Sequence, residues 1–180
     1  KKDFEEAVKW YTKAALDGNE WAQNKLANCY YYGDGVEQDE AKAVEYFRKS
    51  AEAGNKNSMN RLGDCYNYGR GVEQDYQQAI NWYRQAALAG HHIAKYNLGN
   101  CYYNGIGVEQ DYQQAITWYQ QAAEQNIEGA MNKLGECYQY GYGVEQDYQQ
   151  AITWYQKAAE KGNGWAQDML GSFYEYGKGV

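Results

Sequence analysis

Residues 105–108 read Gly-Ile-Gly-Val, one of five Gly-x-Gly-Val tetrapeptides in a chain of 180 residues. The other four begin at Gly33, Gly69, Gly141 and Gly177, so the pattern returns every 36 residues without a slip. A fixed period of this length is typical of repeat proteins, in which each unit buries its apolar face against its neighbours. We therefore expect a linear array whose function lies on an extended surface.

Two helices are predicted in the unit 91–126, one on each side of the tetrapeptide. The first, helix A, has one apolar face made of Ala94, Leu98, Cys101 and Tyr102. The second, helix B, has one made of Ala115, Ile116, Tyr119, Ala122 and Ala123. Gly105 is expected to end helix A, because glycine accepts the left-handed cap conformation, and Asp111 is expected to cap the start of helix B. Asn126 closes the unit where other units have Gly18, Gly54, Gly90 and Gly162.

The same reading of every period predicts one continuous solenoid over residues 1–180. Its full repeats are 19–54, 55–90, 91–126 and 127–162. Residues 1–18 are then helix B of a truncated repeat, and residues 163–180 are helix A of another. Since both ends lack polar capping helices, we expect the array either to continue beyond this segment or to stack head to tail with copies of itself.

These residues resemble the Sel-one-like repeat (SLR) family, a relative of the tetratricopeptide repeat. The pattern that carries the resemblance is Ala-x-x-x-Leu-Gly-x-x-Tyr, then Gly-x-Gly-Val, then Asp-x-x-x-Ala-x-x-Trp-Tyr-x-x-Ala-Ala, and it covers the whole chain. The resemblance implies an all-α, right-handed superhelical solenoid of antiparallel helix pairs, with helix A lining the concave side. Known members are mostly adaptors that hold proteins together, in bacterial and eukaryotic systems. The implied function is a non-catalytic scaffold that binds a protein or peptide.

Composition argues against several other classes of partner. The net charge is −7 and the isoelectric point about 4.9, so the basic stripe that nucleic acid binding needs is missing. No apolar run approaches the roughly 20 residues of a membrane span, so membrane insertion is not expected. No cofactor or metal site is predicted. The compartment stays open between the cytoplasm and the bacterial periplasm or exterior, and the surface rich in Asn and Gln favours a bacterial chain.

Two recurring sets of side chains are interpreted as structural. Cysteines occupy one column of helix A, in which the last unit has Phe173 instead: Cys29, Cys65, Cys101 and Cys137. They are predicted to be buried free thiols, because neighbouring helices lie too far apart for disulfides and no Cys-x-x-Cys spacing suggests zinc. The bulky residues of helix B, each followed by Tyr or Phe, are predicted to pack in the core: Trp10, Tyr46, Trp82, Trp118 and Trp154.

By similarity to the tetratricopeptide groove, the variable columns of helix A predict a concave ligand surface. Its candidate residues are Trp21, Asn24, Asn28, Tyr31, Asn60, Asp64, Asn67, Tyr96, Asn100, Tyr103, Asn132, Glu136, Gln139 and Trp165. Asn amides can both donate to and accept from a peptide backbone, and Tyr offers apolar area with a polar tip.

Other functions remain open on the sequence alone. One is a structural array that assembles with itself. Another is a glycan-binding envelope module, since the aromatic faces of Trp21 and Trp165 suit sugar rings. An enzyme is not expected, because no pair of nucleophile and base and no column of paired acids emerges.

Overall fold

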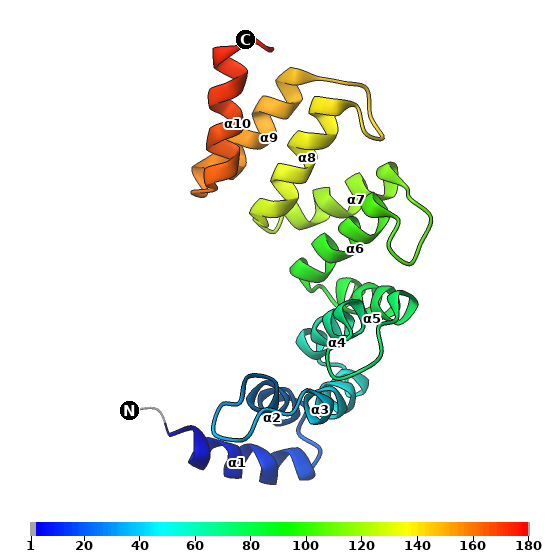
Figure 1. Cartoon of the computed structure of the whole chain (residues 1–180), viewed down its shortest axis with the longest axis vertical. Helices are drawn as coiled ribbons and strands as arrows, with labels where there is room; N and C mark the ends of the chain where they lie inside the picture. Colours follow the sequence, from blue (N-terminus) through cyan, green and yellow to red (C-terminus); the bar gives the residue numbers. More distant parts are fainter. Residues whose placement is uncertain (1–2, 180) are drawn as a thin grey trace. The chain divides into compact units, whose positions relative to one another are not determined.

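A computed structural model describes residues 3–179 of the chain; Lys1, Lys2 and Val180, which bound the predicted truncated repeats, lie outside this range. The described residues form ten α-helices and no strand (Figure 1). The A helices are α2 (Glu20–Tyr32), α4 (Lys56–Tyr68), α6 (His92–Asn104), α8 (Glu128–Tyr140) and α10 (Gly164–Glu175). The B helices are α1 (Phe4–Leu16), α3 (Glu40–Glu52), α5 (Tyr76–Leu88), α7 (Tyr112–Ala123) and α9 (Tyr148–Glu160). The predicted all-α class is confirmed.

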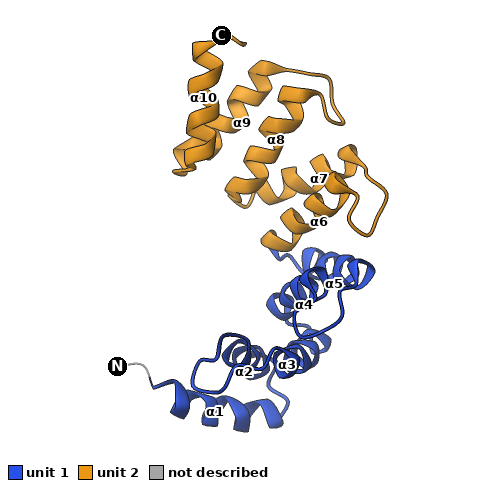
Figure 2. Ribbon diagram, in the orientation of Figure 1, with its two compact units in different colours: residues 1–91 blue, residues 92–180 orange. Residues whose placement is uncertain are grey.

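The helices fall into two compact units, which Figure 2 shows in two colours. Unit 1 ends at His91 and contains α1 to α5; unit 2 begins at His92 and contains α6 to α10. Within each unit, every A helix packs against the B helix that follows it and against the B helix that precedes it in that unit. The core of unit 2 centres on Leu134, Tyr119 and Tyr155, none of which is exposed to solvent.

The helix ends follow local signals in the sequence. Every B helix begins after an aspartate whose side chain accepts the backbone N–H three residues further on: Asp3, Asp39, Asp75, Asp111 and Asp147. These bonds satisfy donors that the first helical turn leaves unpaired. Asn126, with φ of 63°, is the one residue other than glycine with a positive φ in the described range. Both caps expected from the sequence, Asp111 and Asn126, are therefore confirmed.

The prediction that the bulky residues of helix B pack in the core is confirmed in part. Tyr46, Trp82 and Trp154 are partly buried and pack against the core, whereas Trp10 is 63% exposed. Trp154 lies beneath Lys157, whose Nζ is 4.1 Å from the ring centroid. The residue that follows is fully in the core in four of the pairs, as Phe47, Tyr83, Tyr119 and Tyr155. Adjacent residues on a helix point about 100° apart, so only one of the two can point directly into the core.

The second glycine of four tetrapeptides has a role beyond turning the chain: Gly35, Gly71, Gly143 and Gly179. A Cβ atom at Gly71 would overlap the backbone carbonyl of Glu40, at the start of the preceding helix B. At Gly143 it would lie 2.7 Å from Cβ of Tyr112. The loop after helix A thus packs against the start of the preceding helix B, so the tetrapeptide joins successive repeats.

Candidate functional site

The residues predicted to line a groove differ in how far solvent reaches them. Trp21 and Trp165 are 57% and 46% exposed, whereas Asn24, Tyr31 and Asn60 are buried. The others are partly exposed: Asn28, Asp64, Asn67, Tyr96, Asn100, Tyr103, Asn132, Glu136 and Gln139. Most of these polar side chains already hold a partner within the chain.

Asn24 belongs to a buried polar network. Its Nδ2 donates to Oγ of Ser58 at 2.7 Å. Ser58 donates in turn to Oγ of Ser50 at 2.8 Å, and Ser50 donates to the carbonyl of Glu20 at 2.7 Å. Since an unpaired buried amide is costly, this network stabilises the packing of α2, α3 and α4. The amide of Asn24 is therefore engaged inside the protein.

Three further candidates accept hydrogen bonds from tyrosines of the core. Tyr83 donates to Oδ1 of Asp64 at 2.8 Å, and Tyr119 donates to Oδ1 of Asn100 at 2.8 Å. In the next repeat Tyr155 donates to Oε1 of Gln139 at 2.7 Å. Each bond joins helix B to the A helix that precedes it. These three acceptors pair with the hydroxyl groups of tyrosines whose rings are buried. Asp64, Asn100 and Gln139 therefore have a structural role, whether or not they also contact a ligand.

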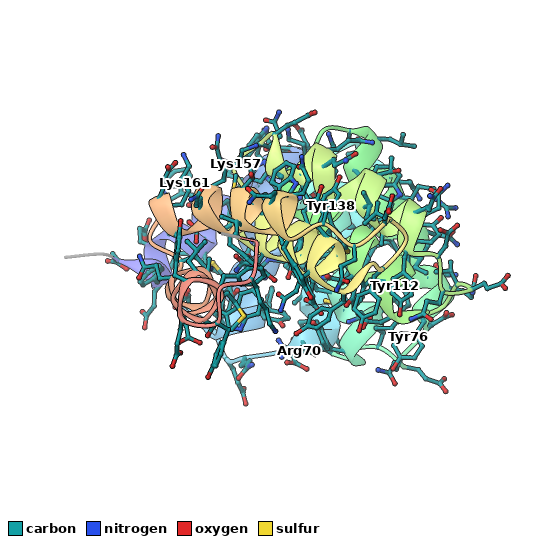
Figure 3. All side chains as sticks on the ribbon, turned by 90° about the horizontal axis from the view of Figure 1, so that it is seen from above. Arg70, Tyr76, Tyr112, Tyr138, Lys157 and Lys161 are labelled. Carbon is teal, nitrogen blue, oxygen red and sulfur yellow. The ribbon has the colours of Figure 1, made fainter. Side chains whose placement is uncertain are left out.

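Unit 1 carries an aromatic surface with two arginines, which we call the arginine cluster: Tyr31, Tyr32, Arg61, Tyr68 and Arg70. Arg70, on the loop after α4 (Figure 3), donates to the hydroxyl of Tyr31 and lies 5.4 Å from the ring centroid of Tyr68. Arg61 donates to the hydroxyl of Tyr32 at 2.9 Å. Tyr32 and Tyr68 are 52% and 63% exposed, so the cluster offers both cations and aromatic area to solvent.

Two carboxylates act on these arginines, Asp64 and Glu40. Asp64 lies 4.0 Å from Arg61, the outer limit of an ion pair, and the charge of Glu40 acts on Arg70. Burial raises the pKa of the Asp64 carboxyl, while the hydroxyl of Tyr83 and the charges of Arg61 and Arg70 act in the opposite direction. The Asp64 carboxylate thus interacts mainly with groups inside the protein.

Unit 2 has counterparts of Tyr31, Arg61, Asp64, Tyr68 and Arg70, which we call the lysine cluster: Tyr103, Lys133, Glu136, Tyr140 and Tyr142. Lys133 pairs with Glu136 at 2.7 Å, and the hydroxyl of Tyr103 donates to the same carboxylate at 2.7 Å. Burial and this bond to Glu136 raise the pKa of Tyr103. Tyr142 stacks on Tyr112, which Figure 3 labels, with ring centroids 5.1 Å apart.

Arg61 and Arg70 are functional candidates that the sequence analysis missed. Arg70 occupies the variable position of a Gly-x-Gly-Val tetrapeptide, for which the sequence predicted no role, and its partner Tyr31 lies 39 residues away. A signal was present: all four arginines of the chain lie between residues 48 and 84. Such clustering in an acidic chain indicates a local basic surface.

The described residues hold no group of three or more His, Cys, Asp or Glu side chains placed to bind a metal ion. In the same range, no helix is sufficiently long and apolar to cross a bilayer. The four cysteines are buried and unpaired as disulfides, as the sequence predicted.

These thiols are expected to be unreactive in the folded protein. Burial raises the pKa of Cys65, Cys101 and Cys137 to about 12. At pH 8 only roughly one such thiol in ten thousand is then ionised, against about a quarter in the unfolded chain, where the pKa is about 8.5. Iodoacetamide should therefore modify the native protein far more slowly than the urea-unfolded protein, as mass spectrometry would measure. Equal rates would contradict this burial.

The raised pKa values also predict how stability depends on pH. Above about pH 8.5 the unfolded chain begins to lose its thiol protons while the folded protein keeps them. The contribution of the cysteines to the free energy of unfolding is therefore complete below pH 8.5 and declines as pH rises from about 8.5 toward 12.

Comparison with known proteins identifies the repeats. The family model for the Sel1 repeat matches residues 1–19, 22–55, 56–91, 92–127, 129–163 and 166–180. A search of curated protein sequences finds no match.

Solved structures give a second line of similarity. A protective antigen with an SLR fold, present in uropathogenic Escherichia coli strains, is 39% identical over 96% of this chain, with a TM-score of 0.94. This chain spans 37% of that antigen's length. A Sel1 repeat protein from Oxalobacter formigenes is 38% identical, with a TM-score of 0.91, over 99% of this chain and 73% of its own. An immunity protein from Pseudomonas aeruginosa is 26% identical, with a TM-score of 0.57, over 88% of this chain and 59% of its own. With helix pairs, tetrapeptides and family model in register along almost its whole length, the chain belongs to the Sel1 repeat family.

Proposed function

We propose that this chain is a non-catalytic scaffold that binds a protein or peptide through the exposed side chains of its A helices. The observation that carries the proposal is the exposure of large aromatic residues there. Trp21, Tyr140 and Trp165 are 57%, 55% and 46% exposed. Aromatic residues with a polar edge are enriched where proteins meet, because they bury much area at little cost in entropy.

Two further observations support a scaffold. Sel1 repeat proteins are generally non-enzymatic and mediate contacts between proteins. Two carboxylates of the A helices are engaged with structural partners, Asp64 with Tyr83 and Glu136 with Lys133. Such pairs lack the free nucleophile and base that catalysis requires. The immunity protein from Pseudomonas aeruginosa suggests, by its similarity, that a protein is the ligand.

The test is a pull-down with the intact chain, followed by mass spectrometry. The variant Trp21→Ala/Tyr140→Ala/Trp165→Ala removes exposed aromatic area from three A helices. Its matched control is Trp10→Ala/Leu16→Ala/Leu88→Ala, which removes side chains 63%, 77% and 77% exposed on B helices. We expect the captured partner to be lost at least about tenfold in the first variant, as for truncated aromatic anchors, and kept in the control. Equal capture of the partner by both variants, with their melting temperatures unchanged, would contradict the proposal.

The glycan alternative rests on the same Trp21 and Trp165, and the same variants test it. A sugar ligand should change tryptophan fluorescence in the control variant and leave the A-helix variant unaffected. If the chain assembles with itself, its molar mass measured by light scattering should rise with protein concentration. A molar mass that stays constant would exclude this alternative.

A further inference from the structure

We propose that the arginine cluster of unit 1 binds carboxylate side chains of an acidic segment in the partner protein. This inference deepens the proposed function and rests on it. It identifies one contact point and the chemistry of what binds there. Three features of the protein support it: the two guanidinium groups are held in place, no carboxylate pairs with them closely, and unit 2 differs at the same positions.

The guanidinium groups are held in place by phenol rings and hydroxyls. Arg70 and Arg61 donate to the hydroxyls of Tyr31 and Tyr32, whose ring centroids are 4.9 Å apart. Arg61 also lies over the ring of Tyr32, at 5.9 Å from its centroid. A guanidinium has five N–H donors, so one bond to a hydroxyl leaves most of them available. Arginines positioned in this way lose less freedom when they bind a planar anion.

Neither guanidinium group is closely paired with a carboxylate among the described residues. Arg70 is exposed and forms no ion pair with a carboxylate in the described part of the chain. Arg61 has only Asp64 at 4.0 Å, and the Asp64 oxygens also accept from Tyr83 at 2.8 Å and from Asn60 at 3.4 Å. Among the described residues, Asp64 is thus the one carboxylate within ion-pair distance of the two guanidinium groups, and it is directed toward the interior; Glu40 acts on Arg70 only from beyond that distance.

The same positions in unit 2 are already neutralised. Lys133 stands where unit 1 has Arg61, and it pairs with Glu136 at 2.7 Å. The longer Glu136 side chain also accepts from Tyr103, whose counterpart in unit 1 is bonded to Arg70. Tyr142 replaces Arg70 altogether. The arginine cluster therefore differs from the lysine cluster in the one property that attracts an anion.

A short acidic peptide segment fits this surface better than nucleic acid does. The protein as a whole carries a net charge of −7, which repels a polyanion such as RNA. A segment with a few carboxylates would meet local cations, and its apolar residues could pack on Tyr32 and Tyr68, which are 52% and 63% exposed. Arginine and carboxylate match in geometry, forming two parallel hydrogen bonds.

The test measures fluorescence anisotropy of a labelled Glu-Gly repeat peptide and its Gln-Gly counterpart at low salt. The test variant is Arg61→Gln/Arg70→Gln. The control, Arg48→Gln/Arg84→Gln, makes the same change in net charge, and Arg48 likewise bonds a tyrosine, Tyr66, at 2.6 Å. We expect the Glu peptide to bind the unaltered protein and the control, and to bind the test variant about tenfold or more weakly. The Gln peptide should bind none of them.

Several results would overturn the inference: no binding of the Glu peptide to the unaltered protein, equal loss in both variants, or equal binding of the Gln peptide. Tighter binding of a single-stranded oligonucleotide than of the Glu peptide would also overturn it. The proposed function fails by a different measurement. If the test variant still captures the cellular partner in full, the arginine cluster is not a contact point, while the scaffold proposal stands on the aromatic variant.

Discussion

Replacing Gly71 by alanine is expected to destabilise unit 1 by about 3 kcal/mol. A Cβ atom there would overlap the carbonyl group of Glu40 and lie 2.9 Å from the backbone nitrogen of Ala41. Both obstacles are main-chain atoms at the start of α3, so no side-chain rotation relieves the overlap. The loop would have to move away from α3, which would open the contact between two repeats.

Gly69→Ala is the matched control, because it separates this overlap from backbone strain. Gly69 and Gly71 have almost the same conformation, with φ of 66° and 69°. A Cβ at Gly69 would meet Cβ of Gln74 at 3.4 Å, an ordinary van der Waals distance. It should therefore cost only the roughly 1 kcal/mol of placing alanine in a left-handed conformation. Urea unfolding of both variants measures the difference, and equal losses would show that the loop is only a turn.

The sequence predicted those parts of the fold that depend on near neighbours. Asp111 caps α7 by bonding Gln114, three residues away, and Asn126 supplies a left-handed turn by itself. Such signals are complete within a few residues, so they can be read without knowing how repeats pack. The positions of helix ends followed directly from them.

The candidate site was harder to predict because it depends on how successive repeats are rotated. Asn24 is buried against Ser58, 34 residues further on, and Arg70 bonds Tyr31, 39 residues back. The period identifies which columns vary, but it does not say which of them face solvent. The same limit explains why the prediction for Trp10 was wrong. Its size suggested a core residue, but its position on α1 leaves it exposed.

The glycines inside the A helices that contact the core tyrosines Tyr83, Tyr119 and Tyr155 are the second place where a substitution should strongly change stability. A Cβ at Gly99 would lie 2.6 Å from Cδ1 and from Cε1 of Tyr119, a ring that is fully buried. Alanine normally stabilises a helix by about 1 kcal/mol relative to glycine, but forcing this ring aside in a packed core costs more. We expect Gly99→Ala to lower the free energy of unfolding by about 2 kcal/mol.

Gly171 tests the cause, because it occupies the same column in α10 and, apart from its chain neighbours and the backbone of its own helix, no described atom lies within 4 Å of its Cβ position. There the helical preference acts alone, so Gly171→Ala should stabilise the protein by roughly 0.5–1 kcal/mol. Gly99→Ala is thus expected to lower the free energy of unfolding and Gly171→Ala to raise it. This difference is expected only if the Tyr119 ring occupies the space that a side chain at position 99 would need. Urea unfolding followed by tyrosine fluorescence measures both variants. A stabilised Gly99→Ala protein would mean that the ring can move, and that these glycines do not set the distance between helix A and helix B.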